Sequence, residues 1–289
     1  MSEDITIEII RVVKVIGIGN IDLEKIQETI HEIKYSFGSY HATFCIDFLS
    51  LASKITGEDI FSLIRNTNML YIIADTQDAA SMNTFREIGK IAYTTKRLTI
   101  GILITHSLSN DEKADSSVSL KTMEFKKYVD CSIPVPHEKL SDELLIGSIK
   151  AIYHTAFDCG WLDFADVRST LKDAGLANFG VGQVSSENRD LRAAENALSQ
   201  MLLNMPFKKS TIVLISISSG PEFSMLEIDN IASMIQERAD DDVVVIFGYF
   251  VDECIGDEIA ASIIAVGFKS EAAKNWEVTA EFSLPSFLK

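Results

Sequence analysis

Apolar runs that are typical of buried strands alternate with helical patterns through the first half of the chain. Strands are expected where β-branched and other apolar residues follow one another, at 8–17, 43–48, 69–74, 98–105 and 131–135. Helices are expected where apolar residues recur every three or four positions, at 22–33, 60–64, 85–93 and 123–129. This alternation predicts an α/β fold built on a doubly wound, mostly parallel sheet.

The second half of the chain has a different rhythm. One long apolar-periodic segment from Leu140 to Phe157 predicts a helix that joins two domains. Beyond it, helices are expected at 164–174, 188–203 and 227–238. Strands are expected at 210–218, 243–250 and 258–266. The order of these elements indicates a smaller, α+β or mixed unit.

The composition is that of a globular protein. Of its 289 residues, 47% are hydrophobic and 24% are charged, which suits two modest domains or one large one. The formal net charge of −16 would repel phosphate backbones and anionic lipid headgroups, so nucleic acid is not an expected partner. No apolar stretch approaches the roughly 20 residues that cross a bilayer, and we expect a cytoplasmic protein without direct membrane insertion.

The residues that most often bind metals are scattered. The four cysteines form no CxxC pair, which favours free thiols in a reducing compartment: Cys45, Cys131, Cys159 and Cys254. The five histidines show neither HxH nor HxxxH spacing: His31, His41, His106, His137 and His154. No metal site is therefore expected.

Three motifs in the second half resemble FtsZ, the GTP-driven filament protein of bacterial division. LDFADVRSTLKDAGLA (162–177) is similar to the family's synergy loop and the helix after it. GVGQVSSENRDLRAAENAL (180–198) is similar to the next segment, and DEIAASIIAVGF (257–268) to the final strand. In the first half the resemblance is confined to strands, such as VVKVIGIGN (12–20) and NMLYIIAD (68–75).

The resemblance implies the fold and the domain organisation of the FtsZ and tubulin superfamily. A degenerate GTPase domain with a Rossmann-like parallel sheet is expected at 1–139, joined by a central helix at 140–158 to an activation domain at 159–269. A short linker and a terminal docking peptide would occupy 270–289.

The loops that bind nucleotide in the family are degenerate in this chain. The glycine-rich first loop is reduced to Gly17, Gly19 and Asn20, and the place of the family's GGGTGTG run reads DTQDAASMN from Asp75 onward. A phosphate cradle needs converging backbone N–H groups, which Cβ atoms would obstruct. The carboxylates of Asp75 and Asp78 would also repel a triphosphate.

The base pocket of the family is not recognisable either. The asparagine that reads guanine in the family falls on Asp142 or its neighbour. We therefore expect no cofactor, and GTP binding of the usual kind is disfavoured. A residual GTPase, or the use of a different nucleotide, stays open as an alternative.

The catalytic carboxylates of the family's synergy loop are retained. The resemblance places them at Asp163 and Asp166, which in the family polarise the attacking water in the nucleotide site of the neighbouring subunit. The family's nearby asparagine is replaced by Trp161. The alternative is structural, because Asp163 also suits the N-cap of a helix and Asp166 its first turn.

The C-terminal sequence EFSLPSFLK resembles the family's terminal peptide, which docks on FtsA and ZipA. The matching residues are Leu284, Pro285, Phe287, Leu288 and Lys289. A short apolar peptide with one proline suits binding in a groove. The alternative is a tail that packs on its own domain.

Three functions are compatible with this pattern. The first is a pseudo-GTPase that meets FtsZ through Asp163, Asp166 and the helix from Met225, and modulates its filaments, with the division site implied as its location. The second is a protein that assembles with itself without nucleotide. The third is the residual GTPase.

Overall fold

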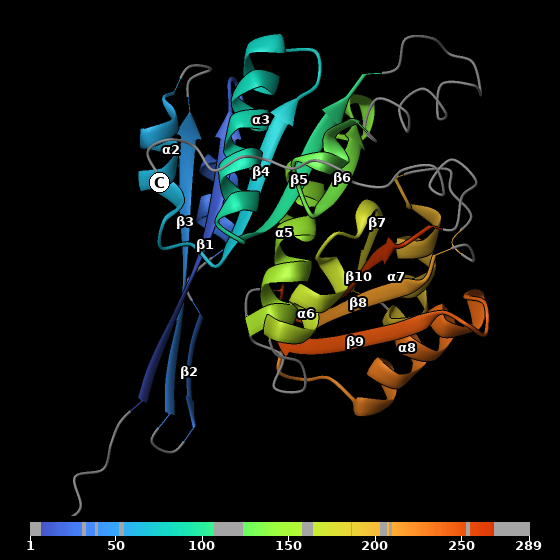
Figure 1. The fold of residues 1–289 in the computed structure, drawn as a ribbon. Helices are drawn as coiled ribbons and strands as arrows, with labels where there is room; N and C mark the ends of the chain where they lie inside the picture. Colours follow the sequence, from blue (N-terminus) through green and yellow to red (C-terminus); the bar gives the residue numbers. More distant parts are fainter. Residues whose placement is uncertain are drawn as a thin grey trace, which may run out of the picture.

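The computed structural model describes residues 7–30, 33–37, 40–51, 55–106, 124–157, 164–185, 187–202, 207, 210–252 and 255–268. Ten strands in this part of the chain form one sheet in the order β2-β3-β1-β4-β5-β6-β7-β10-β8-β9 (Figure 1). No helix within these residues has the length and apolar character needed to cross a membrane.

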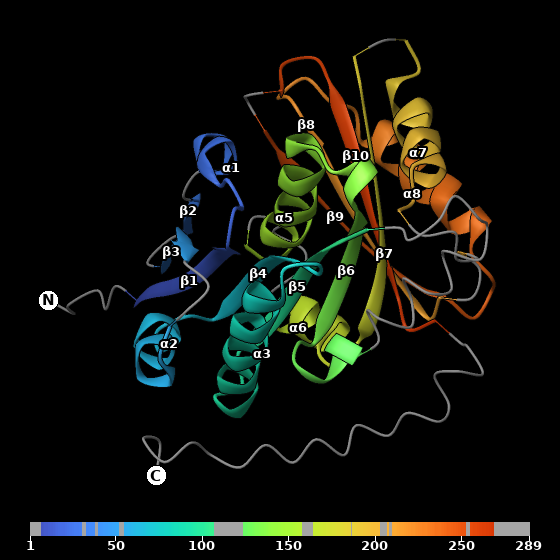
Figure 2. The same ribbon diagram turned by 90° about the horizontal axis from the view of Figure 1, so that it is seen from above.

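Apart from the edge strand β2 (Ile33–Phe37), the first half of the sheet is parallel. Its parallel strands are β1 (Ile7–Ile18), β3 (Tyr40–Leu51), β4 (Met69–Asp75), β5 (Leu98–Thr105) and β6 (Cys131–Pro136). Helices α2 (Gly57–Ile64) and α3 (Ala79–Thr94) lie on one face of the sheet, and α1 (Glu24–Thr29) and α5 (Asp142–Phe157) on the other (Figure 2). This arrangement confirms the predicted α/β fold with a Rossmann-like sheet.

The all-apolar sequence of the central strands follows from burial on both faces. In β4, Tyr71 and Ile73 pack in the cluster that includes α5, whereas Leu70 and Ile72 pack with α2 and α3. All residues of this strand from Met69 to Ala74 are buried. A strand covered on both sides needs apolar residues at every position, which is why the sequence predicted it correctly.

The second half of the sheet is mixed. It contains α6 (Phe164–Leu171), β7 (Gly175–Val184), α7 (Arg189–Ser199), β8 (Ile212–Ser219), α8 (Met225–Arg238), β9 (Val244–Val251) and β10 (Ile259–Val266). Strand β10 is antiparallel to β7 and β8, and β9 is parallel to β8. A short parallel pairing between β6 and β7 makes the sheet continuous. The domain boundaries expected from the sequence remain predictions.

Strand β7 was not predicted, because its sequence GLANFGVGQV is rich in glycine and lacks a strand pattern. The glycines are required by the close approach of α7. A Cβ atom at Gly180 would lie 2.2 Å from the carbonyl oxygen of Ala197, and one at Gly182 would lie 2.3 Å from that of Ala193. Contact between a helix and a strand overrides local propensity here.

Four helix predictions need correction. The helix expected at 22–33 spans only Glu24–Thr29, and Ile33–Phe37 forms β2, which pairs antiparallel with β3. The helix expected at 123–129 is the 3-10 turn η1 (Glu124–Lys127). The helix expected at 85–93 begins earlier, at Ala79, and the one expected at 188–203 ends at Ser199. A further 3-10 turn, η2 (His137–Lys139), follows β6.

Candidate functional site

The glycines after β1 lie at the carboxyl ends of the parallel strands, beside the start of α3. Gly17 pairs with Ile73 across β1 and β4, which places Gly19 and Asp75 at the same edge of the sheet. Gly19 adopts a positive φ of 78°, and a Cβ atom there would lie 2.6 Å from Oγ of Ser81. The loop after β1 therefore rests directly on the first turn of α3.

The N-terminus of α3 is capped by a carboxylate of the chain itself. Asp78 is its N-cap, and Oδ1 accepts a hydrogen bond of 3.0 Å from the backbone N–H of Ala80. The hydroxyl of Ser81 donates to Oδ2 of the same side chain. The hydrogen bond from the Ser81 hydroxyl, followed by that from the backbone N–H of Ala80, lowers the pKa of Asp78 below its ordinary value. The position where a helix N-terminus could hold an external anion is thus taken by Asp78.

Asp75, at the end of β4, is paired with a histidine. Nε2 of His106 lies 2.9 and 3.0 Å from its two carboxylate oxygens. Oδ1 also accepts a hydrogen bond of 2.8 Å from the backbone N–H of Gln77. The ring of His106 stacks on that of His137, with centroids 4.5 Å apart. The last residue of β4 and the residues that directly follow β5 and β6 thereby form a connected group of three side chains.

Neither histidine was predicted to belong to this site. His106 follows the buried strand β5 directly, and His137 follows β6 directly. This position was the available signal, because the carboxyl ends of adjacent parallel strands meet at one edge of a sheet. Spacing along the chain, which was the criterion for metal ligands, could not reveal it.

Asp142 has a different partner from the other predicted site residues. It begins α5, and its carboxylate lies 2.6 Å from Nζ of Lys25 in α1. Hydrogen bonding to Asp142 raises the pKa of Lys25. The contact ties α1 to α5, and both side chains are well exposed.

The predicted synergy loop is described only in part. Asp166 lies in the first turn of α6 and is exposed, and its backbone carbonyl accepts hydrogen bonds from the hydroxyls of Ser169 and Thr170. Asp163 lies outside the described residues. So do the five predicted docking residues, Leu284, Pro285, Phe287, Leu288 and Lys289.

No group of three or more His, Cys, Asp or Glu side chains that could hold a metal ion occurs among the residues that the structure describes. Within the same residues, neither Cys45 nor Cys131 forms a disulfide. Cys159 and Cys254 lie outside them.

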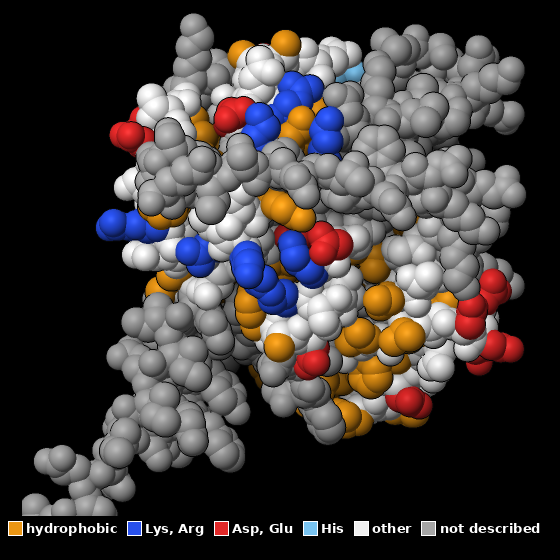
Figure 3. Space-filling view, in the orientation of Figure 1, with side chains coloured by type: hydrophobic (Ala, Val, Ile, Leu, Met, Phe, Trp, Pro, Cys, Tyr) orange, Lys and Arg blue, Asp and Glu red, His pale blue; other side chains and the backbone are white. Residues whose placement is uncertain are grey.

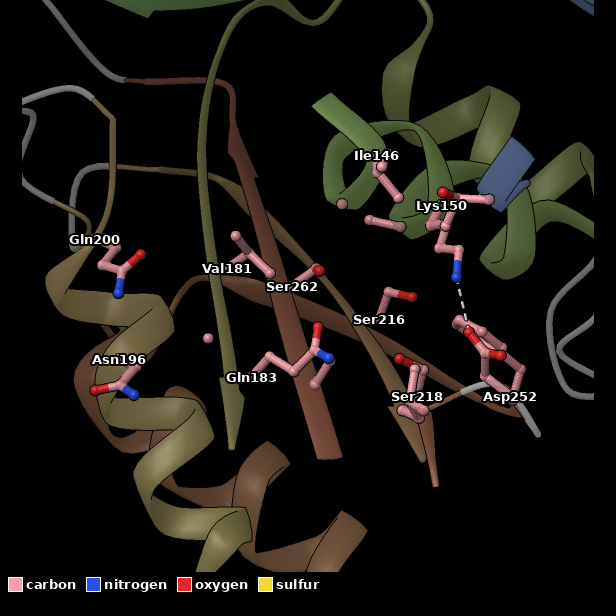
Figure 4. Close-up of a pocket in the computed structure, with 17 residues that line it drawn as sticks. Ile146, Lys150, Val181, Gln183, Asn196, Gln200, Ser216, Ser218, Asp252 and Ser262 are labelled. Carbon is pink, nitrogen blue, oxygen red and sulfur yellow. Dashed lines mark hydrogen bonds and ion pairs between the residues drawn. The ribbon is translucent and has the colours of Figure 1, made fainter. Parts of the chain in front are cut away.

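A separate cavity of about 340 Å³ lies between α5 and the strands of the second half. Figure 4 shows its polar lining, with Ser216, Ser218 and Ser262 on the strands and Lys150 on α5. Nζ of Lys150 forms an ion pair of 2.8 Å with Asp252. The polar part of the lining therefore consists of neutral hydroxyls and amides and of a charge pair that is already neutralised, and the rest is apolar, with Ile146, Val181 and Phe250 among its side chains.

Comparison with known proteins agrees with this geometry. Residues 175–269 match the model of the FtsZ family, C-terminal domain. A tryptophan-to-tyrosine mutant of FtsZ from M. jannaschii aligns with a TM-score of 0.73 and 18% identity, covering 89% of this chain and 91% of that chain. The chain is FtsZ-like in its fold.

Two further structures extend the comparison of this FtsZ-like chain. An FtsZ dimer from M. jannaschii, described as empty, aligns with a TM-score of 0.71 and 18% identity over 96% of this chain and 94% of that one. CetZ2 from Haloferax volcanii, solved as a GTPγS-bound protofilament, gives a TM-score of 0.54 and 13% identity over 75% and 72%. The resemblance inferred from the motifs is confirmed.

Proposed function

We propose that this FtsZ-like protein is a cytoplasmic, cytoskeletal pseudo-GTPase that binds FtsZ or itself and modulates filaments. One observation carries the proposal: two carboxylates of the chain occupy the end of β4 and the N-terminus of α3. Asp78 caps α3, and Asp75 holds His106. A triphosphate at this edge would meet negative charge where a phosphate site needs free N–H donors.

Two backbone donors in the first turn of α3 are already engaged by Asp78. The backbone N–H groups of Ala80 and Ser81 both contribute to the lowered pKa of Asp78. Binding a phosphate there would require Asp78 to leave its cap, and the exposed carboxylate would then stand beside another anion. Like charges a few ångströms apart cost on the order of 1–4 kcal/mol at the surface of a protein. This supports a site that does not accept GTP in the usual way.

The opposite face supports a binding role. Asp166 is exposed at the start of α6, and the first residues of α8, Met225 and Leu226, are 58% and 65% exposed. The resemblance implies that the synergy loop and the start of α8 contact a filament neighbour. We propose that this face meets the nucleotide end of an FtsZ subunit.

Calorimetry with the purified protein tests the nucleotide half of the proposal. Titration with GTP and magnesium should give no binding heat up to millimolar nucleotide, whereas FtsZ in the same buffer should bind. Binding of GTP in the micromolar range would overturn the pseudo-GTPase assignment and favour the residual GTPase.

Co-sedimentation with polymerising FtsZ tests the partner. The protein should enter the pellet, and Asp166→Asn should weaken this association. Glu195→Gln, on the exposed face of α7, is the matched control and should co-sediment normally. Absence from the pellet, with unchanged filament length and GTPase rate, would rule out FtsZ as the partner.

Self-association is the second candidate, since relatives of this fold have been solved as a dimer and as a protofilament. Electron microscopy without nucleotide separates the two candidates, because only a self-assembling protein forms filaments alone.

We also propose that Leu284, Pro285, Phe287, Leu288 and Lys289 dock on FtsA-like or ZipA-like adaptors. A synthetic peptide of residues 281–289 should bind such an adaptor, and replacement of Phe287 by alanine should abolish binding.

A further inference from the structure

Exposed apolar side chains concentrate on one part of the molecule. The described residues contain seven large hydrophobic side chains that are exposed, and five of them lie on β9 or at the start of α8: Val244 (55%), Phe247 (47%), Val251 (44%), Met225 (58%) and Leu226 (65%). Figure 3 shows hydrophobic side chains gathered over β9 and α8. A contiguous exposed apolar patch is a mark of an interaction surface.

Strand β9 is also the outermost strand of the sheet. In the part of the chain that the structure describes, it pairs with β8 alone. Its sequence, VVIFGYFV, contains no charged residue and no proline. Natural edge strands usually carry lysine, proline or a bulge, which prevents another strand from pairing with them. The unprotected edge of β9 indicates that it is covered by a partner strand.

The strand is fixed in an extended conformation before any partner arrives. The ring of Phe250 stacks on His154 of α5, with centroids 3.8 Å apart and planes within 3°. On the other face, the ring of Tyr249 contacts that of Phe223 at 5.3 Å. Because these contacts already order β9, a partner would not need to supply the ordering free energy on this side.

The charge around the patch argues against a second copy of the chain. Three acidic residues, Asp240, Asp241 and Asp242, lie one residue before β9, and no Lys or Arg occurs from Ala239 to Val251. Each copy of the chain carries a formal net charge of −16, so two copies repel each other as whole molecules. Like charges at an interface disfavour association, whereas basic residues on a partner would complement the acids.

We propose that β9 binds an extended segment of another protein, apolar at alternate positions and flanked by Lys or Arg, as an eleventh strand of the sheet. Backbone hydrogen bonds along the free edge would give most of the affinity. Apolar side chains of the added strand would pack beside Phe247 and Val251, which are exposed on the same face of β9. Its basic flank would lie against Asp240 and Asp241. This interaction does not depend on the state of the nucleotide site.

The test uses the full-length protein and a fluorescent synthetic peptide of six alternating valine and threonine residues with two lysines at each end. Fluorescence anisotropy should report binding in the micromolar range. A peptide with glutamates in place of the lysines should bind at least tenfold more weakly, and one with N-methyl groups on alternate backbone nitrogens should not bind. Hydrogen exchange should slow at β9 amides in the complex.

Substitutions locate the site. Phe247→Lys should weaken peptide binding at least tenfold and leave the unfolding midpoint unchanged, since Phe247 is 47% exposed. Leu191→Lys, at the 37% exposed position on α7, is the matched control and should bind normally. Equal binding of the N-methylated peptide, absence of binding at 1 mM, or a dimer that Phe247→Lys dissociates would each overturn the proposal.

Discussion

The side chain at a single position decides how closely α7 lies on β7. Gly182 has no room for a Cβ atom, which would lie 2.3 Å from the carbonyl oxygen of Ala193 and 2.7 Å from the nitrogen of Ala197. At Gly147 in α5, a Cβ atom would make an ordinary contact of 3.5 Å with Val181. Glycines that look alike in the sequence therefore have different structural roles.

We expect Gly182→Ala to lower the free energy of unfolding by about 1–3 kcal/mol, because the added methyl group forces α7 away from β7. Gly147→Ala is the matched control and should be neutral or stabilising, since alanine is the better helix former. Urea denaturation measures both. Equal effects of the two variants would contradict the close approach of α7.

Because the thiol of Cys131 is buried, we expect the free energy of unfolding to fall at alkaline pH. Burial raises the pKa of this thiol from 9.0 to about 12. Between these values the unfolded chain releases the proton and the folded protein keeps it, so stability falls as pH rises. The loss should reach about 1.4 kcal/mol at pH 10, and it should be absent at pH 7.

Urea denaturation at pH 7, 9 and 10 checks this, with Cys131→Ala as the comparison. The variant is expected to be less stable at pH 7 but to lose about 1.4 kcal/mol less than the natural protein between pH 7 and pH 10. An identical pH dependence of both proteins would show that Cys131 does not contribute.

At the scale of elements, α8 is held at its start by a capping box. Oγ of Ser224 accepts a hydrogen bond from the backbone N–H of Leu226, and Oε2 of Glu227 accepts one of 2.8 Å from the N–H of Ser224. Glu227 also pairs with Arg189, with Nε and Oε1 2.6 Å apart, and this bond lowers the pKa of Glu227. The cap thus joins α8 to the start of α7.

We expect Ser224→Ala to lower the free energy of unfolding by about 1 kcal/mol, because the N–H groups of the first turn lose their acceptor. Ser233→Ala, at an exposed position inside α8, should be neutral or slightly stabilising. Urea denaturation distinguishes the two. A destabilising Ser233→Ala with a neutral Ser224→Ala would refute the assigned cap.

Elements buried on both faces could be predicted from the sequence, and elements defined by tertiary contact could not. Strands β4, β5 and β6 end within one residue of the expected positions, because continuous apolar runs mark them. Strand β7 escaped prediction because its glycines serve the packing of α7. Strand β2 was not predicted, because the helical pattern of residues 22–33 runs up to its first residue and its pairing with β3 is a tertiary contact.

For the candidate site, the sequence predicted some of the residues but not the contacts between them. The resemblance to the nucleotide loops of FtsZ assigned Gly17, Gly19 and Asp75 to one site, and the structure places them at one edge of the sheet. The resemblance did not supply their contacts. The pairing of Asp75 with His106, and of Asp142 with Lys25, joins residues 31 and 117 positions apart in the chain, and no local pattern encodes it.

At the scale of the whole molecule, the two ends of the fold differ in what they can bind. The strand ends near Asp75 and Asp78 carry acidic groups that are already satisfied within the chain, whereas the opposite face exposes Asp166 and the start of α8. A head-to-tail filament needs both surfaces on every subunit. A subunit with only one competent surface would end a filament rather than extend it.

If the proposed association with FtsZ holds, filament length should follow the ratio of the two proteins. At one copy per ten FtsZ subunits and saturating affinity, the mean length should fall to about ten subunits, because each copy ends one filament. Electron microscopy across a series of ratios measures this, with Asp166→Asn as the weakened variant and Glu195→Gln as the control. Long filaments with the protein spaced along them would instead require two competent surfaces, and would exclude capping.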